Sequence, residues 1–244
     1  MYTVPITIII PILNEAKNLK KLVLEIKKVK SEINAKYFEL IFIDDNSTDE
    51  TLSVLKKLKK KNNFLSFYIR NAAERDLSKS CIMGFDKSNY KNIIVMDGDL
   101  QHPPRFIKNL IQTFFENKAD IVVGSRNLLI KRGYGLSWLR YISSIIIIYM
   151  INIFLENKTS DPLSGFFIFK KELYIKNKSK LFGKGYKILA DLIFSSEKNL
   201  KIYDENILFN SRKSGKSKMN FKVLFNLIIF LSRSFFIKWK KKLT

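Results

Sequence analysis

Two carboxylates separated by one residue, Asp97 and Asp99, follow a short apolar run that ends at Met96. Alternate residues of a strand point to the same side, so both carboxylates would leave the strand in one direction, and Gln101 continues the same two-residue step. Closely held oxygen ligands suit a divalent cation such as Mg²⁺, which keeps several waters and also takes the phosphates of a substrate. The spacing therefore predicts a metal and phosphate site, and its alternative is a solvated turn after a strand.

A second acidic cluster, residues 44–49, follows another apolar run and weakens the explanation by a simple turn. A carboxylate at a strand end can accept hydrogen bonds from the amide or ring N–H groups of a nucleotide base. The alternative role of Asp45, Ser47 and Asp49 is the N-cap of the following helix. For Ser47 or Thr48 we prefer that interpretation.

These motifs need a scaffold that brings them together. Apolar runs alternate along the chain with amphipathic stretches, which predicts a largely parallel sheet covered by helices on both faces. We predict strands over 3–10, 38–43, 64–69, 92–96 and 120–123, and helices over about 15–30, 49–61, 77–88 and 105–117. Ligands of such sheets bind outside the carboxyl ends of the strands. The polar motifs at 11–15, 44–49 and 97–101 all fall there.

Composition bounds the class of protein. The chain has 244 residues, of which 46% are hydrophobic, enough for one large domain or two small ones. Its single cysteine, Cys81, excludes an internal disulfide and suits a small buried hydrophobe in a reducing compartment. The N-terminus has no basic region before its apolar run, so no signal peptide is expected. The net charge of +22 fits an anionic partner: a membrane surface, a nucleic acid or a phosphorylated substrate.

The ordered motifs resemble the inverting glycosyltransferases of family 2, which have the GT-A fold. The order and spacing are those of dolichol-phosphate mannose synthases and related polyprenyl-phosphate glycosyltransferases, over almost all of residues 4–218. The motifs that carry the resemblance lie at 11–15, 44–49, 97–104, 124–126, 161–166, 185–188 and 212–218.

The resemblance implies an α/β fold of the GT-A type, with a mostly parallel sheet and helices on both faces, to which the basic C-terminal residues of this chain would add amphipathic helices. A catalytic domain would span 1–218, with an interfacial helix at about 137–155, and a basic membrane-proximal tail would span 219–244. The implied reaction is the inverting transfer of a hexose from a nucleotide sugar to polyprenyl or dolichyl phosphate. Mannose is the expected sugar, and GDP-mannose is the expected donor. The alternatives are transfer of glucose or another sugar from a UDP-sugar, and transfer to a glycan or protein. A nucleic-acid-binding protein would leave the acidic edge unexplained, so no nucleic-acid partner is expected.

The resemblance also implies site residues. Those of the nucleotide-sugar site are Pro11, Leu13, Glu15, Phe42, Asp44, Asp97, Gly98, Asp99, Arg126, Arg212 and Lys218. Those of catalysis are Asp99, Arg126 and Arg212, and those of the acceptor phosphate are Arg126, Arg140 and Ser144. Mg²⁺ or Mn²⁺ would be held by Asp97, Asp99 and Gln101. Arginine suits these roles because it binds phosphate bidentately and stays charged, although Arg140 equally fits a surface position.

The reaction needs no general base, because a phosphomonoester is mostly dianionic at pH 7 and attacks without losing a proton. His102, the only histidine, is accordingly interpreted as a loop residue beside Pro103. One departure from the family is the segment 75–78, where many relatives carry Arg-Gly-Leu-Gly. Both glycines are missing here, and with them two positions that adopt positive φ easily. Ser78 would cap the following helix, and the base preference stays open.

Two apolar segments bear on membrane binding. Residues 142–155 are too short for the ~20 residues of a spanning helix, and Asn226 and Arg233 interrupt residues 223–239. Both segments suit helices lying in the interface, with a buried core helix as the alternative for the first. After Glu205 the chain has ten Lys or Arg residues and no acid, which suits an anionic leaflet. We therefore expect a peripheral protein on the cytoplasmic face of a membrane, compatible with a membrane-anchoring protein as partner.

Overall fold

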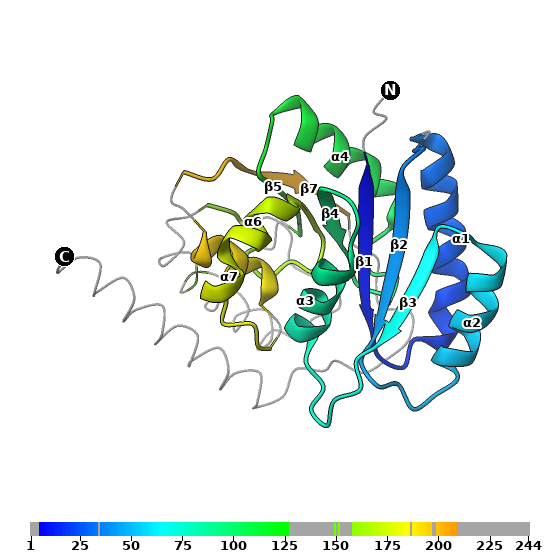
Figure 1. Cartoon of the computed structure of the whole chain (residues 1–244). Helices are drawn as coiled ribbons and strands as arrows, with labels where there is room; N and C mark the ends of the chain where they lie inside the picture. The colour runs from blue at the N-terminus through cyan, green and yellow to red at the C-terminus, as the bar shows by residue number, and fades with distance from the viewer. Residues whose placement is uncertain are drawn as a thin grey trace, which may run out of the picture.

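The computed structural model of the chain describes residues 5–33, 35–126, 149, 151, 158–185, 187–196 and 199–208. The described residues form a seven-stranded sheet in the order β3-β2-β1-β4-β6-β5-β7 (Figure 1). The strands are β1 (Ile6–Ile12), β2 (Phe38–Asp44), β3 (Leu65–Ile69), β4 (Asn92–Val95), β5 (Ile121–Ser125), β6 (Phe167–Lys170) and β7 (Ile202–Asn206). The helices are α1 (Ala16–Glu32), α2 (Thr51–Lys61), α3 (Leu77–Lys87), α4 (Ile107–Glu116), α6 (Lys171–Asn177) and α7 (Ile188–Ser195), with short 3-10 turns at Pro104–Phe106 and Lys178–Lys180.

The sheet is mostly parallel and is covered on both faces. Strands β1, β2, β3 and β4 run parallel, β7 is parallel to β5, and β6 runs antiparallel between β4 and β5. Helices α1, α2 and α4 contribute to the core on one face, and α3, α6 and α7 contribute to the core on the other (Figure 1). Because both faces are buried, the inner strands are largely apolar, and β1 is buried along its whole length, as the sequence predicts for such a sheet.

Strand β1 shows how one apolar run serves both cores. Ile8 and Ile10 pack with α1 and α4, whereas Ile9 between them packs with α3 on the opposite face. Successive side chains of a strand point to opposite faces, so an unbroken isoleucine run is needed where helices lie on both. This strand lies inside the sheet, and the first polar motif, residues 11–15, begins in its last two residues.

The strands and helices predicted up to residue 126 are present, with ends shifted by a few residues. The second half adds elements that are not predicted from the sequence: β6, α6, α7 and β7. Strand β6 is four residues long, too short to show a period, and β7 is a polar edge strand.

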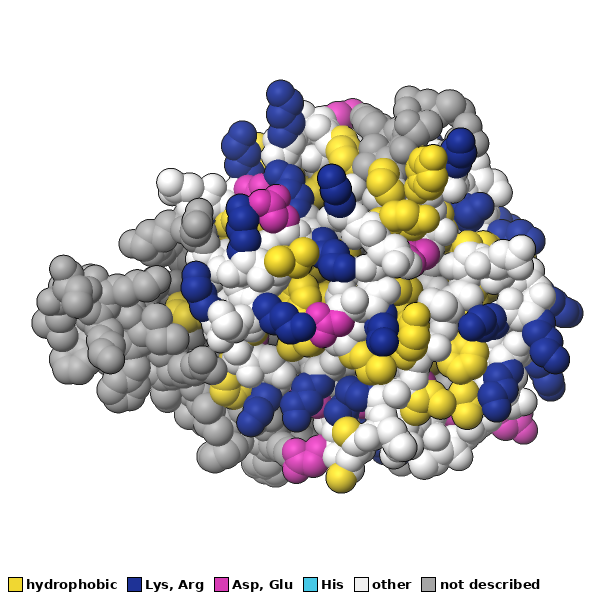
Figure 2. Space-filling model, viewed as in Figure 1, with side chains coloured by type: hydrophobic (Ala, Val, Ile, Leu, Met, Phe, Trp, Pro, Cys, Tyr) yellow, Lys and Arg dark blue, Asp and Glu magenta, His cyan; other side chains and the backbone are white. Residues whose placement is uncertain are grey.

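The predicted C-terminal basic helices lie outside the described residues. Of the apolar segment 142–155 only Tyr149 and Ile151 are described: Tyr149 is exposed, and Ile151 is buried in the core beneath α3, α6 and α7. Among the helices described, none is both long enough and apolar enough to cross a bilayer. On the face seen in Figure 2, Lys and Arg side chains are spread among other residue types, as solvated helix faces would produce.

Candidate functional site

The three polar motifs lie at neighbouring strand ends. The register of the parallel pairs sets Ile12 of β1 beside Asp44 of β2, and Ile9 of β1 beside Val95 of β4. The segments that follow these strands therefore leave the sheet side by side at its carboxyl edge, which is where ligands of α/β sheets bind. The structure thus brings together the three motifs that the sequence placed at this edge.

The first two motifs hold each other through hydrogen bonds. Asn14 donates its N–H to Ser47 Oγ (2.8 Å), and its Oδ1 accepts from the N–H of Thr48 (2.8 Å). Asp44 accepts from the N–H of Ser47 (3.2 Å) and from its hydroxyl. The predicted capping role of Ser47 or Thr48 is wrong, since α2 begins only at Thr51 and the hydroxyl of Ser47 joins the two loops instead.

The residues expected to form the nucleotide pocket fall into two environments. Pro11 and Phe42 are buried within their strands, and Phe42 belongs to the core on the α1 face. Leu13 and Glu15 are partly exposed in the loop before α1, where the N–H of Glu15 donates to the hydroxyl of Thr51 (3.0 Å). The loop residues are thus the ones that reach the open edge, while the strand residues support it from below.

The turn after β4 presents its two carboxylates differently. Asp99 is buried, and its Oδ1 accepts the N–H of Gln101 at 3.0 Å. Asp97 has a side chain that is 38% exposed and lies against Gly165, where an added Cβ would stand 2.7 Å from its Oδ2. Gly98 is required by packing, because a Cβ there would stand 2.7 Å from Cγ2 of Ile12. A side chain at either glycine would therefore displace the acidic turn.

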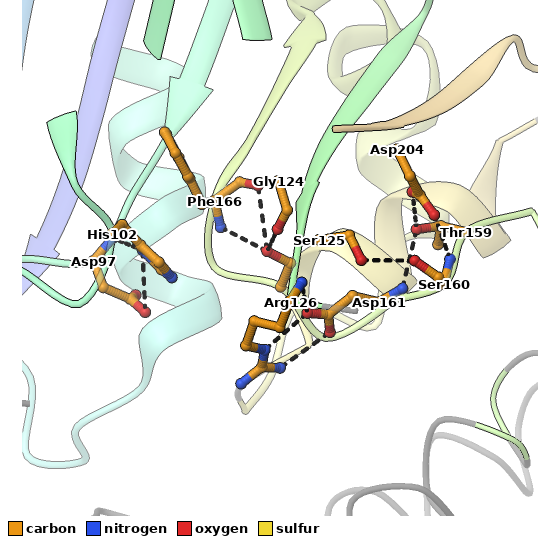
Figure 3. Close-up of polar contacts among 11 residues, drawn as sticks. Asp97, His102, Gly124, Ser125, Arg126, Thr159, Ser160, Asp161, Phe166 and Asp204 are labelled. Carbon is orange, nitrogen blue, oxygen red and sulfur yellow. Dashed lines mark hydrogen bonds and ion pairs between the residues drawn. The ribbon is translucent and has the colours of Figure 1, made fainter. Parts of the chain in front are cut away.

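His102 is a buried structural residue. Its Nδ1 accepts the N–H of Asp97 at 3.1 Å, and its ring stacks on Phe166 at a centroid distance of 5.3 Å (Figure 3). Burial lowers the pKa of His102, an effect that the nearby carboxylates of Asp97 and Asp99 oppose only in part. The imidazole is therefore neutral, and its 3.6 Å approach to Asp97 Oδ2 is not an ion pair.

Arg126 is held by a buried carboxylate. Its Nε and Nη2 donate to Asp161 Oδ2 (2.8 Å) and Oδ1 (3.0 Å), a bidentate pair drawn in Figure 3. Burial disfavours the charge of Arg126, but Asp161 and then Asp97 raise its pKa above the ordinary value. With its side chain 32% exposed, Arg126 is a fixed cation at the surface of the site.

Asp161 itself is anchored by a polar network that reaches the edge of the sheet. Its N–H donates to Thr159 Oγ1 (3.3 Å), and that hydroxyl donates to Asp204 Oδ1 on β7 (2.6 Å). The N–H of Ser160 donates to Asp204 Oδ2 (2.7 Å; Figure 3). The sequence alone indicates no role for Asp161 or Asp204, and its only signal is the place of Asp161 in a family motif.

The charged side chains converge on one place. Val95 of β4 and Val123 of β5 both pair with Phe167 of β6, so the turn that carries Asp97 and Asp99 and the segment that carries Arg126 leave the sheet at the same edge. Within the described ranges, no group of three or more His, Cys, Asp or Glu residues could hold a metal ion by itself. A cation at Asp97 and Asp99 would thus need other oxygen ligands, such as Gln101 and substrate phosphates, a donor set typical of Mg²⁺. The remaining predicted residues, Arg140, Ser144, Arg212 and Lys218, lie outside the described residues.

The start of α3 differs from the prediction for segment 75–78. Asp76, not Ser78, is the N-cap: its Oδ1 accepts the N–H of Lys79 at 3.0 Å. Ser78 lies inside the helix, is 1% exposed, and its hydroxyl has no hydrogen-bond partner in the part of the chain that the structure describes. A buried hydroxyl without a partner costs free energy.

Replacing Ser78 by alanine is therefore expected to raise the free energy of unfolding, by about 1 kcal/mol, because an unsatisfied group is removed and alanine favours the helix. Urea unfolding followed by circular dichroism measures the change. Ser80 is the matched control, since it is buried in the same helix and its hydroxyl donates to the backbone O of Asp76 (3.1 Å). Ser80→Ala should lower stability, and equal losses in both variants would contradict the prediction.

A buried lysine lies just before α7. Lys187 is 4% exposed, and its Nζ stands 5.2 Å from the centroid of the Phe182 ring. Burial lowers the pKa of Lys187 to about 7, although Asp191 and Asp76 both favour its charged form. Between this value and the ordinary 10.5, the unfolded chain binds a proton that the folded chain lacks. The free energy of unfolding therefore rises with pH in that window. Below the window Lys187 is charged in both states, and the loss of stability from burying its charge has its full value.

Replacing Lys187 by methionine should remove this pH dependence. Between pH 7 and 9 the wild-type protein should gain about 1–2 kcal/mol of unfolding free energy relative to the variant. Urea unfolding at pH 6, 7, 8 and 9 tests this. Lys184→Met, which changes an exposed lysine of the same loop, should run parallel to the wild type. Parallel curves for Lys187→Met as well would mean that Lys187 titrates normally.

Comparisons with known proteins identify relatives of this chain. Residues 7–177 match the protein family described as Glycosyl transferase family 2. The chain is 32% identical over 239 residues to the dolichol-phosphate mannosyltransferase of Pyrococcus furiosus, across 96% of this chain and 64% of that protein. It is 29% identical over 240 residues to the dolichol-phosphate mannosyltransferase of Saccharomyces cerevisiae, across 96% of this chain and 88% of that protein. The chain thus spans somewhat less than two thirds of the archaeal relative.

Solved structures share the fold. Mannosyl-3-phosphoglycerate synthase from Rubrobacter xylanophilus superposes with a TM-score of 0.68 at 13% identity, over 98% of this chain and 75% of that one. Glucosyl-3-phosphoglycerate synthase from Mycobacterium tuberculosis, in complex with Mn²⁺, UDP-glucose and phosphoglyceric acid, superposes with a TM-score of 0.65 at 18% identity. The match covers 86% of this chain and 72% of that one. These similarities confirm the predicted GT-A type of α/β fold.

Proposed function

Because this chain belongs to glycosyl transferase family 2, we propose that it transfers a hexose from a nucleotide sugar to a polyprenyl phosphate. Mannose is the first choice of sugar, and GDP-mannose of donor, because curated relatives that align with 91–96% of the chain are named dolichol-phosphate mannosyltransferase. The observation that carries the proposal is the convergence of Asp97, Asp99 and Arg126 at the carboxyl edge of the sheet, where β4 and β5 end level with each other. Carboxylates alone would repel the phosphates of both substrates, so a cation and a fixed guanidinium are what the reaction needs at this edge.

We assign the donor side to the ends of β1, β2 and β4. The nucleotide would lie along Leu13, Glu15 and Asp44, supported from below by Pro11 and Phe42. Asp97, Asp99 and Gln101 would hold Mg²⁺ or Mn²⁺, which neutralises the charge of the leaving nucleoside diphosphate when bound. Gly98 keeps this turn close to β1. Arg212 and Lys218, outside the described residues, complete the proposed donor site.

We assign the acceptor phosphate to Arg126. Asp161 engages Nε and Nη2 on one edge of its guanidinium, so the group is held in place and stays charged. A guanidinium has five N–H donors, more than one carboxylate takes up, and it suits phosphate binding. Arg140 and Ser144 are proposed as further acceptor contacts. The dianionic acceptor needs no general base, which agrees with the buried and neutral state of His102.

The lipid acceptor places the proposed reaction at a membrane surface, on the cytoplasmic face. In this proposal residues 1–218 form the catalytic domain, the segment at about 137–155 lies in the interface, and the basic tail 219–244 binds anionic lipid. A membrane-anchoring protein remains part of the proposal as a partner, and nucleic acid does not.

One assay tests the reaction. Purified protein is incubated with Mn²⁺ or Mg²⁺, a panel of GDP- and UDP-sugars, and either polyprenyl phosphate or a glycan acceptor, and products are identified by mass spectrometry. We expect a polyprenyl-phosphate mannose formed from GDP-mannose. A product formed only from a UDP-sugar would support the glucosyltransferase alternative, and transfer only to the glycan would overturn the lipid acceptor.

A further inference from the structure

The side chain of Asp76 joins segments that are far apart in the chain. Its Oδ1 accepts the N–H of Lys79, and its Oδ2 accepts the N–H of Gly185 at 2.9 Å, across 109 residues. The contact with Gly185 is doubled, because the carbonyl of Gly185 accepts the N–H of Ser78 at 2.8 Å. The start of α3 is thereby fastened to the loop that precedes α7.

The segment before α3 is fastened to the end of β2. The N–H of Asp76 donates to Asp45 Oδ2 at 2.7 Å, and the other carboxylate oxygen of Asp45 is bound by Arg70. Arg75 donates to the backbone O of Asn46 at 3.3 Å. Residues 70–76 therefore run along Asp45 and Asn46, directly after the proposed base contact Asp44.

The loop 182–185 is held by carboxylates at both ends. Asp191 on α7 accepts the N–H groups of Phe182 (2.9 Å) and Gly183 (2.7 Å), and Asp76 accepts that of Gly185. Gly183 and Gly185 have φ of 65° and 86°, which side-chain-bearing residues rarely adopt. The contacts of Asp191 lie within the loop and its own helix, so it is Asp76 that ties the loop to the end of β2.

This junction lies at the candidate site. The thiol of Cys81, one turn into α3, is buried, and Asp97, Asp76 and Asp45 all add to the rise of its pKa that burial causes. The geometry gives the same location: Asp45, which accepts the N–H of Asp76, donates its own N–H to the carbonyl of Ile12 at 2.9 Å, so Asp76 lies at the carboxyl ends of β1 and β2. Backbone N–H groups engage both oxygens of Asp76, so it acts on a substrate through the loops it holds.

We propose that Asp76 is a positioning residue of the donor site: it locks the loop 182–185 onto the segment 70–76 beside Asp44, and this fixed wall raises affinity for the nucleoside diphosphate. The proposal rests on the proposed function, because it takes the ligand at this edge to be a nucleotide sugar. A wall that is already ordered loses less conformational freedom when the ligand binds, which strengthens binding.

The test uses Asp76→Ser, because serine is as good an N-cap as aspartate but is too short to hold Lys79 and Gly185 together. The matched control is Asp86→Ser at the far end of the same helix. Asp86 Oδ1 accepts from Tyr174 Oη (2.7 Å) and Lys178 Nζ (2.7 Å), so this change also weakens a link between α3 and the C-terminal elements, away from the site. Titration calorimetry with GDP and with UDP, each with Mn²⁺, gives Kd, and steady-state kinetics gives donor KM and kcat.

We expect Asp76→Ser to raise the nucleotide Kd and the donor KM by about five-fold or more, with kcat within about two-fold and a melting temperature near that of Asp86→Ser. Asp86→Ser should leave Kd and KM unchanged. If the wild-type protein binds nucleotide and Asp76→Ser has the same Kd, the role of Asp76 is overturned but the proposed function is not. An equal rise of Kd in Asp86→Ser, or a loss confined to kcat, would overturn the role of Asp76 in the same way. A wild-type protein that binds neither nucleotide would overturn the proposed function, and the role of Asp76 with it.

Discussion

Asp99→Asn is expected to lower sugar transfer by about 100-fold or more while the protein stays folded. Asparagine can still accept the N–H of Gln101, so the turn after β4 keeps its local hydrogen bond. It removes one negative ligand from the proposed cation, which then binds weakly and neutralises the leaving diphosphate poorly. Transfer rates measured over a titration of Mg²⁺ and of Mn²⁺, with circular dichroism melts of the same samples, test this expectation.

Asp120→Asn is the matched control for Asp99→Asn. Asp120 precedes β5, accepts from Lys170 Nζ (2.6 Å) and from the N–H of Lys201 (3.0 Å), and so has a structural role away from the acidic turn. Its replacement should leave the metal dependence of transfer unchanged. Near-normal turnover of Asp99→Asn at every metal concentration would show that Asp99 holds no catalytic cation.

Arg126→Lys should lower kcat/KM for polyprenyl phosphate by about ten-fold or more, because lysine keeps the charge but lacks the planar guanidinium that binds a carboxylate or phosphate through two hydrogen bonds. Lysine cannot make the two parallel hydrogen bonds that hold Arg126 on Asp161, and so the cation is no longer fixed. Initial rates over a range of acceptor concentrations measure the effect. Arg105→Lys, which changes an exposed arginine over the ring of Phe106, should leave the rate unchanged.

The partner of Arg126 gives a sharper version of this test. If Asp161 acts by holding Arg126, then Asp161→Asn should lower transfer as well, and the double variant should lose much less than the product of the two single losses. Fully multiplicative losses would mean that the two residues act independently. An unchanged rate in Arg126→Lys would place Arg126 outside the site.

The scaffold of the first half could be predicted because its signals are local. A strand buried on both faces must be apolar throughout, as in Ile6–Ile12, and a helix that covers a sheet must be amphipathic, as in Ala16–Glu32. Parallel strands put their carboxyl ends at one edge, so the meeting of the motifs after β1, β2 and β4 followed from the alternation of elements alone.

The second half required the tertiary structure. Strand β6 lies between β4 and β5, and its Lys170 pairs with Asn92 of β4. The strand is thus stabilised by residues that are far from it in the sequence. Four residues carry too little pattern to predict such a strand, and antiparallel insertion into a parallel sheet has no local signature.

The roles of polar side chains were decided in the same way. By local preference alone, Ser47 would cap the helix that follows it. In the fold, the hydroxyl of Ser47 instead accepts the backbone N–H of Asn14 from another loop. Asp161 meets Arg126 across 35 residues, and Asp76 meets Gly185 across 109. The sequence alone determined which residue types stand at the carboxyl edge, because strand and helix periods place them there. Only the folded chain decided which of them bind each other, because a buried polar group takes whatever partner the packing brings within reach.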